Sequence, residues 1–480
     1  MCENKETSDI IGRKEEIQVL RNCLDSDQSE FVIVFGRRRI GKTYLIKQFF
    51  KEKFSFYATG AKSGLKADKL ALFQEALLSY GDQNEAAPKS WLEAFRRLKA
   101  LLERKDCYRE KRSGKRIIFL DEVPWMDSKR SDFKMALDYF WNAYASSKND
   151  IILIVCGSAT SWIINNIVKD TGGFYNRVTR RIHLLPFTLK ECKELARRKR
   201  LDYDEETIAK AYMIFGGVPF YWRLLLPSES LDQGVERLCF QENGDLHFEF
   251  QNLFSSLFGA KGYHREIVTA LRQKASGLTR NELIAKGIPG GKDLTKALEE
   301  LEQCGFIRVF NKPGKTKDSF YQIKDPFSRF ALDFLAQKKT SSWRSYTSSP
   351  SYYSWLGNAF ELLCLNHIKE IKNALGISEV ETFEYSFRSK KHSPGAQIDL
   401  VIERRDGVSN LCEMKCTSSP FLIDKSYAEN LACKEEAYRL ETKTKNAVRT
   451  TLISFKGVVS NSYSRDIRNI ITLEDFFRRR

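Results

Sequence analysis

The chain has 480 residues, of which 42% are hydrophobic and 29% charged, and its formal net charge is +17. This composition is typical of a globular protein, and the length is too great for one hydrophobic core, so two to four domains are expected. It excludes a membrane protein, because the longest apolar runs, such as IILIVCG, are far shorter than a bilayer span.

The first residues, MCENKETSDI, show no basic stretch followed by an apolar stretch, so we expect a cytoplasmic protein rather than a secreted one. The eleven cysteines are scattered without a CxxC pair, which predicts neither a disulfide framework nor a zinc site. The basic excess favours a polyanionic partner such as nucleic acid or nucleotide phosphates. The alternative is that the charge serves solubility alone.

From about Ile11 to Phe187, apolar strand-like runs alternate with helical patterns such as WLEAFRRLKALLE and DFKMALDYFWNAYAS. The runs are FVIVFG, FSFYATG, RIIFLDE, IILIVCGS and RIHLLPF. This alternation predicts a parallel sheet wrapped by helices, and we assign it to residues 9–187.

The first chemical motif follows the first strand-like run. Gly36, Gly41, Lys42 and Thr43 match the pattern G-x-x-x-x-G-K-[ST], with a strand before it and a helix after it. The glycines let backbone N–H groups turn onto phosphate oxygens, while the lysine neutralises phosphate charge and the threonine hydroxyl ligates Mg²⁺. The beginning helix adds its positive end. We therefore predict a phosphate cradle for ATP; the alternative is a tight strand-to-helix turn.

Two further strand-like runs end in groups that a cradle needs. RIIFLDEVPWMD places Asp121 and Glu122 at the end of a buried strand. Asp121 is expected to hold Mg²⁺, and Glu122 to orient or deprotonate the attacking water; otherwise the pair caps the next helix. IILIVCGSATSW ends in small polar residues, of which Ser158 or Thr160 is expected to sense the γ-phosphate.

The segment GGFYNRVTRRIHLLPF carries arginines in a loop that begins with glycines. Arg177, Arg180 or Arg181, supplied by a neighbouring subunit or domain, is expected to stabilise the charge of the transition state. The alternative is a solvated basic loop.

The second half of the chain changes character. Residues 188–255 are helical, interrupted by GGVPFYW, and residues 256–335 are helices followed by a hairpin with a basic tip, which predicts a winged helix-turn-helix. Residues 336–354 are rich in serine and lysine and resemble a linker. From residue 355 to residue 480 the pattern is again mixed α/β.

A second site is predicted on a β-hairpin in that last part. QIDLVIER and VSNLCEMKC are strand-like runs joined by Arg405–Gly407. A three-residue loop with Gly407 in the left-handed region pairs Asp399 directly with Glu413, whereas a two-residue turn would pair it with the wrong face. Because alternate residues share a face, Lys415 joins the two carboxylates.

This constellation can hold a divalent cation. Two converging carboxylates bind Mg²⁺ or Mn²⁺, and a lysine beside them positions water or stabilises a phosphate in reaction. Glu361, on the preceding amphipathic helix, is expected to complete the carboxylate shell. The alternatives are a salt-bridged strand face, or a related fold used only for binding.

The motifs of the first half together resemble the archaeal-type ATPases, a STAND/AAA-like group of P-loop proteins. IIGRKEEIQVL resembles the family's adenine-side box, with Gly12 and Arg13 in place, and FYATG, DEVPWM, GFYNRVTRRIHLLPF and FGGVPFYW resemble its further motifs. The resemblance implies a helical lid over residues 188–255 and ATP and Mg²⁺ as cofactors. Asn176 stands where the family often has glycine, immediately before Arg177.

The resemblance continues into the last part, since many such ATPases carry a C-terminal domain of the restriction-endonuclease-like, PD-(D/E)XK fold. WLGNAFELLCLNHI, QIDLVIERRDGVSNLCEMKC and AVRTTLISFKG carry that similarity. It departs from the PD form, because Pro394 lies several residues before Asp399. The implied fold is an α/β multidomain protein: a P-loop parallel-sheet core, a helical lid, a winged helix and a restriction-endonuclease-like α/β domain.

The expected function is ATP binding and hydrolysis by a protein that acts on nucleic acid, DNA above all, with a metal-dependent nuclease domain. Nucleotide state would then control access of DNA to the second site. The alternative is an ATP-dependent switch whose last domain only binds DNA or protein; a third interpretation is a chaperone-like or defence-related signalling ATPase. A homo-oligomer is compatible with all three.

Overall fold

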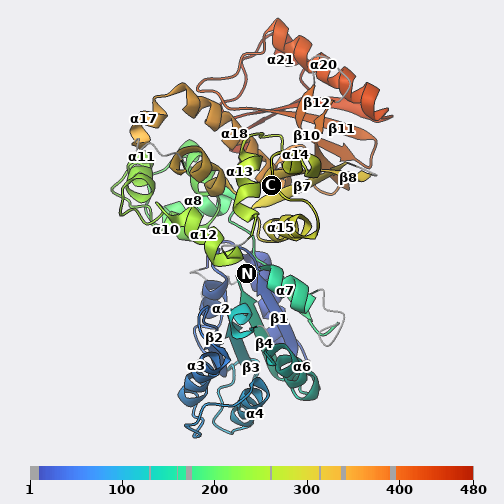
Figure 1. Cartoon of the computed structure of the whole chain (residues 1–480). Helices are drawn as coiled ribbons and strands as arrows, with labels where there is room; N and C mark the ends of the chain where they lie inside the picture. The colour runs from blue at the N-terminus through green and yellow to red at the C-terminus, as the bar shows by residue number, and fades with distance from the viewer. Residues whose placement is uncertain are drawn as a thin grey trace. The chain divides into compact units, whose positions relative to one another are not determined.

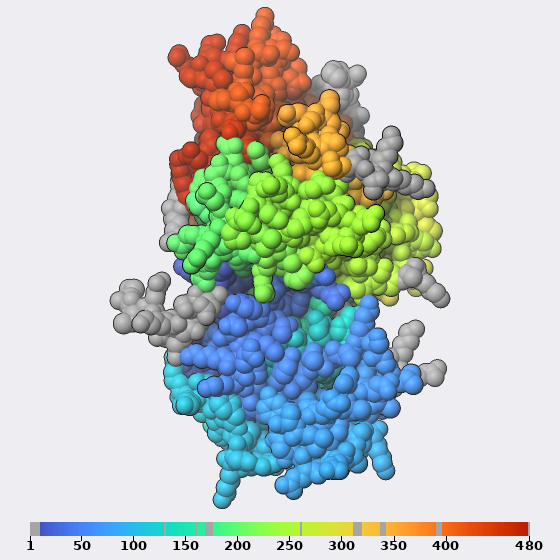
Figure 2. All heavy atoms as spheres, turned by 90° about the vertical axis from the view of Figure 1, so that its left-hand side faces the viewer, coloured from blue at the N-terminus to red at the C-terminus, as the bar shows by residue number. Residues whose placement is uncertain are grey.

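The computed structural model describes eight stretches, and the other residues are grey in Figure 2. The described stretches are residues 10–128, 131–158, 160–168, 176–259, 262–312, 315–336, 342–389 and 396–478. The chain divides into two compact units, with the break between Pro186 and Phe187. Among the described residues, no helix is both long and apolar enough to cross a membrane.

The first unit contains the parallel sheet that the sequence predicts (Figure 1). Its strands are β1 (Glu30–Phe35), β2 (Phe56–Thr59), β3 (Arg116–Asp121), β4 (Ile151–Gly157) and β5 (Arg180–His183). They lie in the order β2-β3-β4-β1-β5, and all the pairings are parallel. Strand β4 therefore separates β1, which enters the glycine-rich loop, from β3, which ends in Asp121.

Helices cover both faces of this sheet because its central strands are apolar on both sides. In β1, Phe31 and Ile33 belong to one apolar core and Val32 and Val34 to the other. The first core contains residues of α3 (Lys66–Ser79), α4 (Trp91–Leu102) and α6 (Phe133–Ala143). The second contains residues of α1 (Lys14–Asp25) and α2 (Lys42–Phe49).

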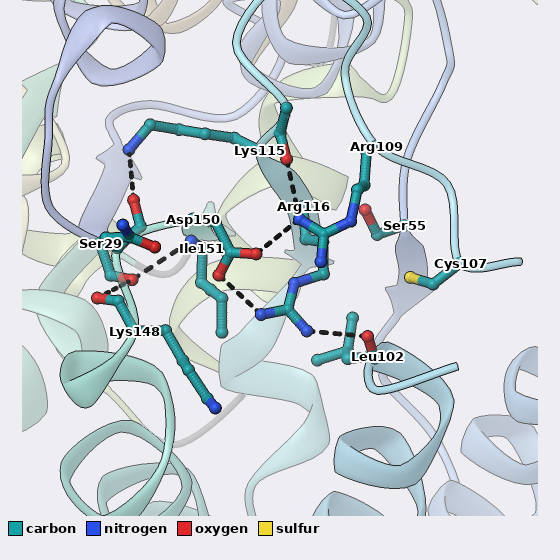
Figure 3. Close-up of polar contacts among 12 residues, drawn as sticks. Ser29, Ser55, Leu102, Cys107, Arg109, Lys115, Arg116, Lys148, Asp150 and Ile151 are labelled. Atoms are coloured by element: carbon teal, nitrogen blue, oxygen red, sulfur yellow. Dashed lines mark hydrogen bonds and ion pairs between the residues drawn. The ribbon is translucent and has the colours of Figure 1, made fainter. Parts of the chain in front are cut away.

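A network of charged groups lies at the amino-terminal ends of strands β3 and β4 (Figure 3). The Asp150 carboxylate, just before β4, accepts hydrogen bonds at 2.6 Å from the Arg116 guanidinium of β3 and at 2.6 Å from Arg109. The buried Arg116 also donates to the Leu102 carbonyl at 2.7 Å, at the end of α4. The network thus ties β3, β4 and α4 together where the strands begin.

Replacing Asp150 with asparagine is expected to destabilise the protein by about 1–2 kcal/mol. The expected loss is this small because solvent screens a partly exposed carboxylate. Burial opposes ionisation of Asp150, but the hydrogen bonds from Arg116 and then Arg109 outweigh it and lower the pKa of the carboxyl. A lowered pKa contributes stability that is present above the unfolded value, near 3.9, and is lost as pH falls through the folded value. Urea unfolding of both proteins from pH 7 to pH 3 should show the difference shrinking at the acid end; a constant difference would contradict this.

The second unit begins with helices and continues with a small three-stranded sheet. The helices are α8 (Leu189–Arg198), α9 (Glu205–Phe215), α10 (Pro219–Arg223), α11 (Leu231–Val235) and α12 (Glu249–Phe258). Then follow α13 (His264–Arg272), β6 (Leu278–Thr279), α14 (Arg280–Ala285), α15 (Lys292–Gln303), β7 (Ile307–Lys312) and β8 (Lys315–Ile323). The antiparallel sheet has the order β6-β8-β7. The expected basic tip of the β7–β8 hairpin lies outside the described side chains.

A mixed sheet forms the C-terminal part, in the order β13-β12-β11-β10-β9. Its elements are α18 (Pro350–Asn366), α19 (Ile368–Ala374), β9 (Thr382–Arg388), β10 (Gln397–Arg404), β11 (Val408–Lys415), α20 (Lys425–Thr442), β12 (Ala447–Ser454) and β13 (Asn469–Thr472). Strands β9, β10 and β11 pair antiparallel, whereas β11, β12 and β13 pair parallel. Helix α20 provides the crossover that a parallel β11–β12 pair requires.

The segment 336–354, expected to be a linker, is structured over its described part. It contains α17 (Trp343–Thr347) and the start of α18. The Trp343 side chain is buried, and its indole nitrogen donates to Asp232 Oδ1 at 2.8 Å. The serine-rich composition suggested a linker, but the aromatic residues within the segment are what anchor it to the helical part.

The junction between α18 and α19 binds the parts of the second unit to one another. The ring of the buried His367 accepts the Leu189 N–H at Nε2, 3.0 Å away, and donates from Nδ1 to the Leu363 carbonyl at 2.8 Å. Burial lowers the pKa of His367, in keeping with this neutral form. From β7, Arg308 donates to the Leu365 carbonyl at 2.6 Å. The helix that carries Glu361 is therefore bonded both to the start of α8 and to the three-stranded sheet.

Candidate functional site

The loop between β1 and α2 has the backbone of a phosphate cradle. Gly36 has φ of 142°, and a Cβ atom there would collide with the Leu184 carbonyl, so the position accepts only glycine. Gly41 has φ of 90° and caps the start of α2, where free backbone N–H groups face an incoming anion. The buried Lys42 ammonium lies within the loop, 3.0 Å from the Gly36 carbonyl and 2.9 Å from the Arg37 carbonyl.

The groups expected to hold Mg²⁺ lie side by side. The Thr43 hydroxyl donates to Asp121 Oδ2 at 2.7 Å, which joins the first turn of α2 to the end of β3. Asp121 is buried, and its Oδ1 accepts the Glu122 N–H at 2.9 Å. A hydroxyl and a carboxylate oxygen that converge beside a phosphate cradle are the oxygen donors that Mg²⁺ prefers, so these residues fit the ion.

Glu122 is held by the strand that lies between the cradle and β3. Its backbone is left-handed, with φ of 47°, an uncommon conformation for a residue other than glycine. Its carboxylate accepts hydrogen bonds from the Ser158 hydroxyl at 2.9 Å and from the Ser158 N–H at 3.2 Å. Ser158 follows β4 directly, so the sheet order places it where the sequence analysis expected a sensor. The side chain of the alternative, Thr160, lies outside the described residues.

The expected adenine-side residues contact the cradle loop. Gly12 and Arg13 both have positive φ, 61° and 55°, and Arg13 begins α1. The buried Arg13 guanidinium donates to the Ile40 carbonyl at 3.3 Å and lies 3.7 Å from Glu16. Of the two residues that the family resemblance assigns to the adenine side, Arg13 is therefore bonded to the phosphate loop itself.

Arg177 lies near the amino-terminal ends of the strands, whereas the cradle lies at their carboxyl ends. The parallel register pairs Val32 with Arg180, so Arg177 lies level with the residues before β1. Gly36, by contrast, comes directly after the last residue of β1. At about 3.3 Å per residue the separation is roughly 20 Å, too far for an arginine side chain to reach its own cradle. Arg180 is engaged at that edge by Glu30 at 3.0 Å. Asn176 has φ of 54°, a left-handed conformation that asparagine tolerates.

The second candidate site lies on the β10–β11 hairpin, and its register is the one predicted. The pairs run from Glu403 with Ser409 to Leu400 with Cys412. Continued by one position, this register sets Asp399 opposite Glu413, at a point where the pairing of β10 with β9 is irregular. Gly407 has φ of 83°, as the three-residue loop requires. Asp399 Oδ2 accepts the Met414 N–H at 3.0 Å, which fixes its carboxylate against β11.

The carboxylates of this site are buried and influence one another. Glu413 is only 2% exposed, and burial followed by the charge of Asp399 raises its pKa to about 7. Burial also raises the pKa of Asp399. Burial, and then Asp399, raises the pKa of Glu361 to about 8. Clustered carboxylates with raised pKa values lack a sufficient counter-charge, which is the condition that a cation relieves.

Helix α20 supplies groups that the sequence analysis missed. The Lys434 ammonium lies 2.7 Å from Glu413 Oε2, whereas Lys415, the lysine predicted to act beside the carboxylates, lies over the Tyr427 ring at 5.1 Å. Tyr427, Leu431 and Lys434 share one face of the helix by their spacing of four and then three residues. That periodicity was available in the sequence, but nothing there indicated which sheet face α20 would cover.

The third expected carboxylate, Glu361, lies in the field of Asp399 and Glu413, whose charges help to raise its pKa. As the side chains stand, no group of three His, Cys, Asp or Glu among the described residues could hold a metal ion. The completion of a carboxylate shell by Glu361 stays a prediction. Arg308 and Arg329 are the positive charges that favour the ionised form of Glu361, so its charge is balanced partly from outside the hairpin.

The parallel sheet and the loop between β1 and α2 have the features of a P-loop core. Residues 10–225 match the family described as an ATPase domain predominantly from Archaea. This part of the chain is thus similar to the archaeal-type ATPase domains, as the resemblance implied.

Two relatives from Methanocaldococcus jannaschii are similar in sequence. The protein MJECL04 is 24% identical over 403 residues, which cover 82% of this chain and 84% of the relative. The ATP-binding protein MJ0423 is 42% identical over 44 residues, 9% of this chain and 75% of that one.

Two solved structures resemble the chain. The Walker-type ATPase paby2304 of Pyrococcus abyssi has a TM-score of 0.48 at 21% identity, over 68% of this chain and 96% of its own. The ORC2 protein of Aeropyrum pernix, in complexes with ADPNP and ADP, has a TM-score of 0.44 at 15% identity, over 72% of this chain and 98% of its own.

Proposed function

We propose that the first unit binds and hydrolyses ATP. The observation that carries this proposal is the contact set around the cradle: Lys42 inside the loop, Thr43 on Asp121, and Ser158 on Glu122. A bound Mg²⁺, held by Thr43 and Asp121, would neutralise charge on the β- and γ-phosphates. The protein's own groups bind the phosphates and orient the attacking water.

The reaction is a displacement at the γ-phosphorus. A water molecule oriented by Glu122 forms the new phosphorus–oxygen bond as the bond to the β–γ bridging oxygen breaks, giving ADP and inorganic phosphate. Glu122 accepts the proton that the water loses. Ser158, whose hydroxyl contacts both carboxylate oxygens of Glu122, aligns that base, and we assign to it the sensing of the γ-phosphate.

Replacing Lys42 with alanine is expected to lower the ATP hydrolysis rate by about 10²–10³-fold, because the cradle loses its charged donor. Steady-state phosphate release at saturating ATP and Mg²⁺ checks this. The matched control is Lys47→Ala on the same helix, whose ammonium lies over Tyr57 and away from the cradle. Hydrolysis that survives in the Lys42 variant would contradict the assignment.

We also propose that Arg177 acts on the nucleotide of a neighbouring subunit, since the sheet register places it out of reach of its own. The proposal implies a homo-oligomer. Mixing Arg177→Ala with Lys42→Ala subunits should restore part of the activity that neither variant has alone, because each mixed interface can pair an intact cradle with an intact arginine. A mixture no more active than the two variants measured separately would reject the proposal that Arg177 acts between subunits.

For the C-terminal part we propose a restriction-endonuclease-like fold that cleaves nucleic acid, DNA above all, with a divalent cation. Support comes from the Asp399 carboxylate, which accepts the N–H of Met414, the residue after Glu413. It comes also from Glu413 Oε1, a buried oxygen for which the described part of the chain offers no hydrogen-bond partner. A cation bound by the two carboxylates would supply positive charge to a phosphate. In the reaction, water attacks the phosphorus, the bond to one ester oxygen breaks, and the products are a phosphomonoester and an alcohol.

The second candidate is an ATP-dependent switch whose C-terminal domain only binds. It draws on the ion pair between Lys434 and Glu413, since a lysine there balances the carboxylate without a metal. Metal binding separates the two proposals, because only the nuclease requires a cation at the carboxylates.

We propose that residues 256–335 form a winged helix, on the basis of the order of α13, β6, α14, α15 and the β7–β8 hairpin. The accessible face of α15 is not basic. Its buried residues face the domain core, and the exposed charges are Asp293, Glu299 and Glu302 beside Lys292 and Lys296. Such a face is a poor match for the DNA phosphates, so we assign DNA contact to the C-terminal domain.

A further inference from the structure

Beside Asp399 and Glu413, two buried oxygen atoms have no hydrogen-bond partner within the stretches that the structure describes. One is Glu413 Oε1, and the other is the hydroxyl of Tyr427, which comes from α20 rather than from the hairpin. Burial, and then the charges of Glu413 and Asp399, raises the pKa of Tyr427. A buried hydroxyl without a partner costs stability, so a bound group is expected to satisfy it.

The ring of Tyr427 is fixed from several directions. Its backbone N–H donates to Asp424 Oδ1 at 2.7 Å, the cap that begins α20. Phe421 packs edge-on against the ring, with 4.9 Å between ring centroids. The Lys415 ammonium lies over the ring face, 5.1 Å from its centre. The hydroxyl is therefore presented by a rigid ring, with a positive charge beside it.

We propose that Tyr427 is a substrate-binding residue, whose hydroxyl donates a hydrogen bond to a phosphate oxygen held next to Asp399 and Glu413. This inference rests on the proposed cation-dependent function of the C-terminal domain. A phosphate oxygen accepts from a hydroxyl and is attracted by the Lys415 ammonium, and it approaches two carboxylates only when a cation lies between them.

The test uses the full chain and two tyrosine variants. Tyr427→Phe removes the hydroxyl and keeps the ring under Lys415. Tyr438→Phe is the matched control on the same helix, because its hydroxyl bonds the Tyr385 hydroxyl at 3.1 Å, away from the carboxylates. Calorimetry measures Mn²⁺ affinity with and without deoxythymidine 5′-monophosphate as the phosphate probe, and single-turnover plasmid cleavage is measured in parallel.

In the wild type the nucleotide is expected to tighten Mn²⁺ binding about tenfold, since the two share the site. Tyr427→Phe should bind Mn²⁺ alone as the wild type does, but lose most of this tightening and cleave about tenfold more slowly. Tyr438→Phe should keep both. A merely structural role for Tyr427 would instead lower the affinity for Mn²⁺ alone.

The outcomes separate this inference from the function on which it rests. Equal tightening in wild type and Tyr427→Phe overturns the role of the hydroxyl and leaves the cation site standing, as would be found if a buried water satisfied the tyrosine. If the wild type binds Mn²⁺ and the nucleotide does not change its affinity, the role of the hydroxyl is likewise overturned and the cation site stands. A wild type that binds no Mn²⁺ overturns both the cation-dependent function and this inference.

Discussion

Replacing Glu122 with glutamine is expected to lower the rate of ATP hydrolysis about 10²–10⁴-fold while ATP still binds. Glutamine keeps the shape of the side chain and its contact with the Ser158 hydroxyl, but it cannot accept a proton from water. The cradle, with Lys42 and Thr43, is untouched, so nucleotide affinity is expected to change less than about threefold.

Single-turnover hydrolysis with radiolabelled ATP, together with equilibrium binding of a fluorescent ATP analogue, measures the two quantities separately. Glu103→Gln, an exposed position at the end of α4, serves as the control. A variant that hydrolyses ATP at the wild-type rate would remove Glu122 from the mechanism. A wild type that itself turns over rarely, with little further loss in the variant, would favour the switch.

Replacing Glu413 with glutamine is expected to abolish divalent-cation binding by the C-terminal domain and any nucleic-acid cleavage with it. The variant removes one of the two opposed carboxylates, and an amide oxygen is a much weaker ligand than a carboxylate. The loss of Mn²⁺ affinity should be at least about 100-fold, since even groups that only support a metal ligand are worth 10–100-fold.

Calorimetric titration with Mn²⁺ and a plasmid-nicking assay with Mg²⁺ or Mn²⁺, each with and without ATP, measure these effects. Glu403→Gln is the matched control, because it lies on the same hairpin and its carboxylate accepts the Tyr385 hydroxyl at 3.0 Å. Lys415→Ala should lower cleavage and leave Mn²⁺ bound. If the wild type binds Mn²⁺ no better than Glu413→Gln, the carboxylates are structural and the switch proposal is preferred.

Much of both sites followed from the sequence because their decisive contacts are local. The cradle residues from Gly36 to Thr43 are contiguous, and the strand that precedes Asp121 is marked by its own apolar run. The pairing of Asp399 with Glu413 depended only on strand alternation and on a three-residue loop ending in glycine. Spacings of this kind are read directly from the chain, since no distant element intervenes.

What the sequence by itself determined is therefore the ATPase core with its cradle and the face of the hairpin that bears Asp399, Glu413 and Lys415. Only the tertiary structure decided which distant groups meet them. The order of the strands places Ser158 beside Glu122, and the strand register places Arg177 at the amino-terminal ends of the strands. The packing of α20 places Lys434 against Glu413 and determines the position of Tyr427. These outcomes depend on how separate elements pack, and a packing arrangement depends on the summed burial of many side chains rather than on any local pattern.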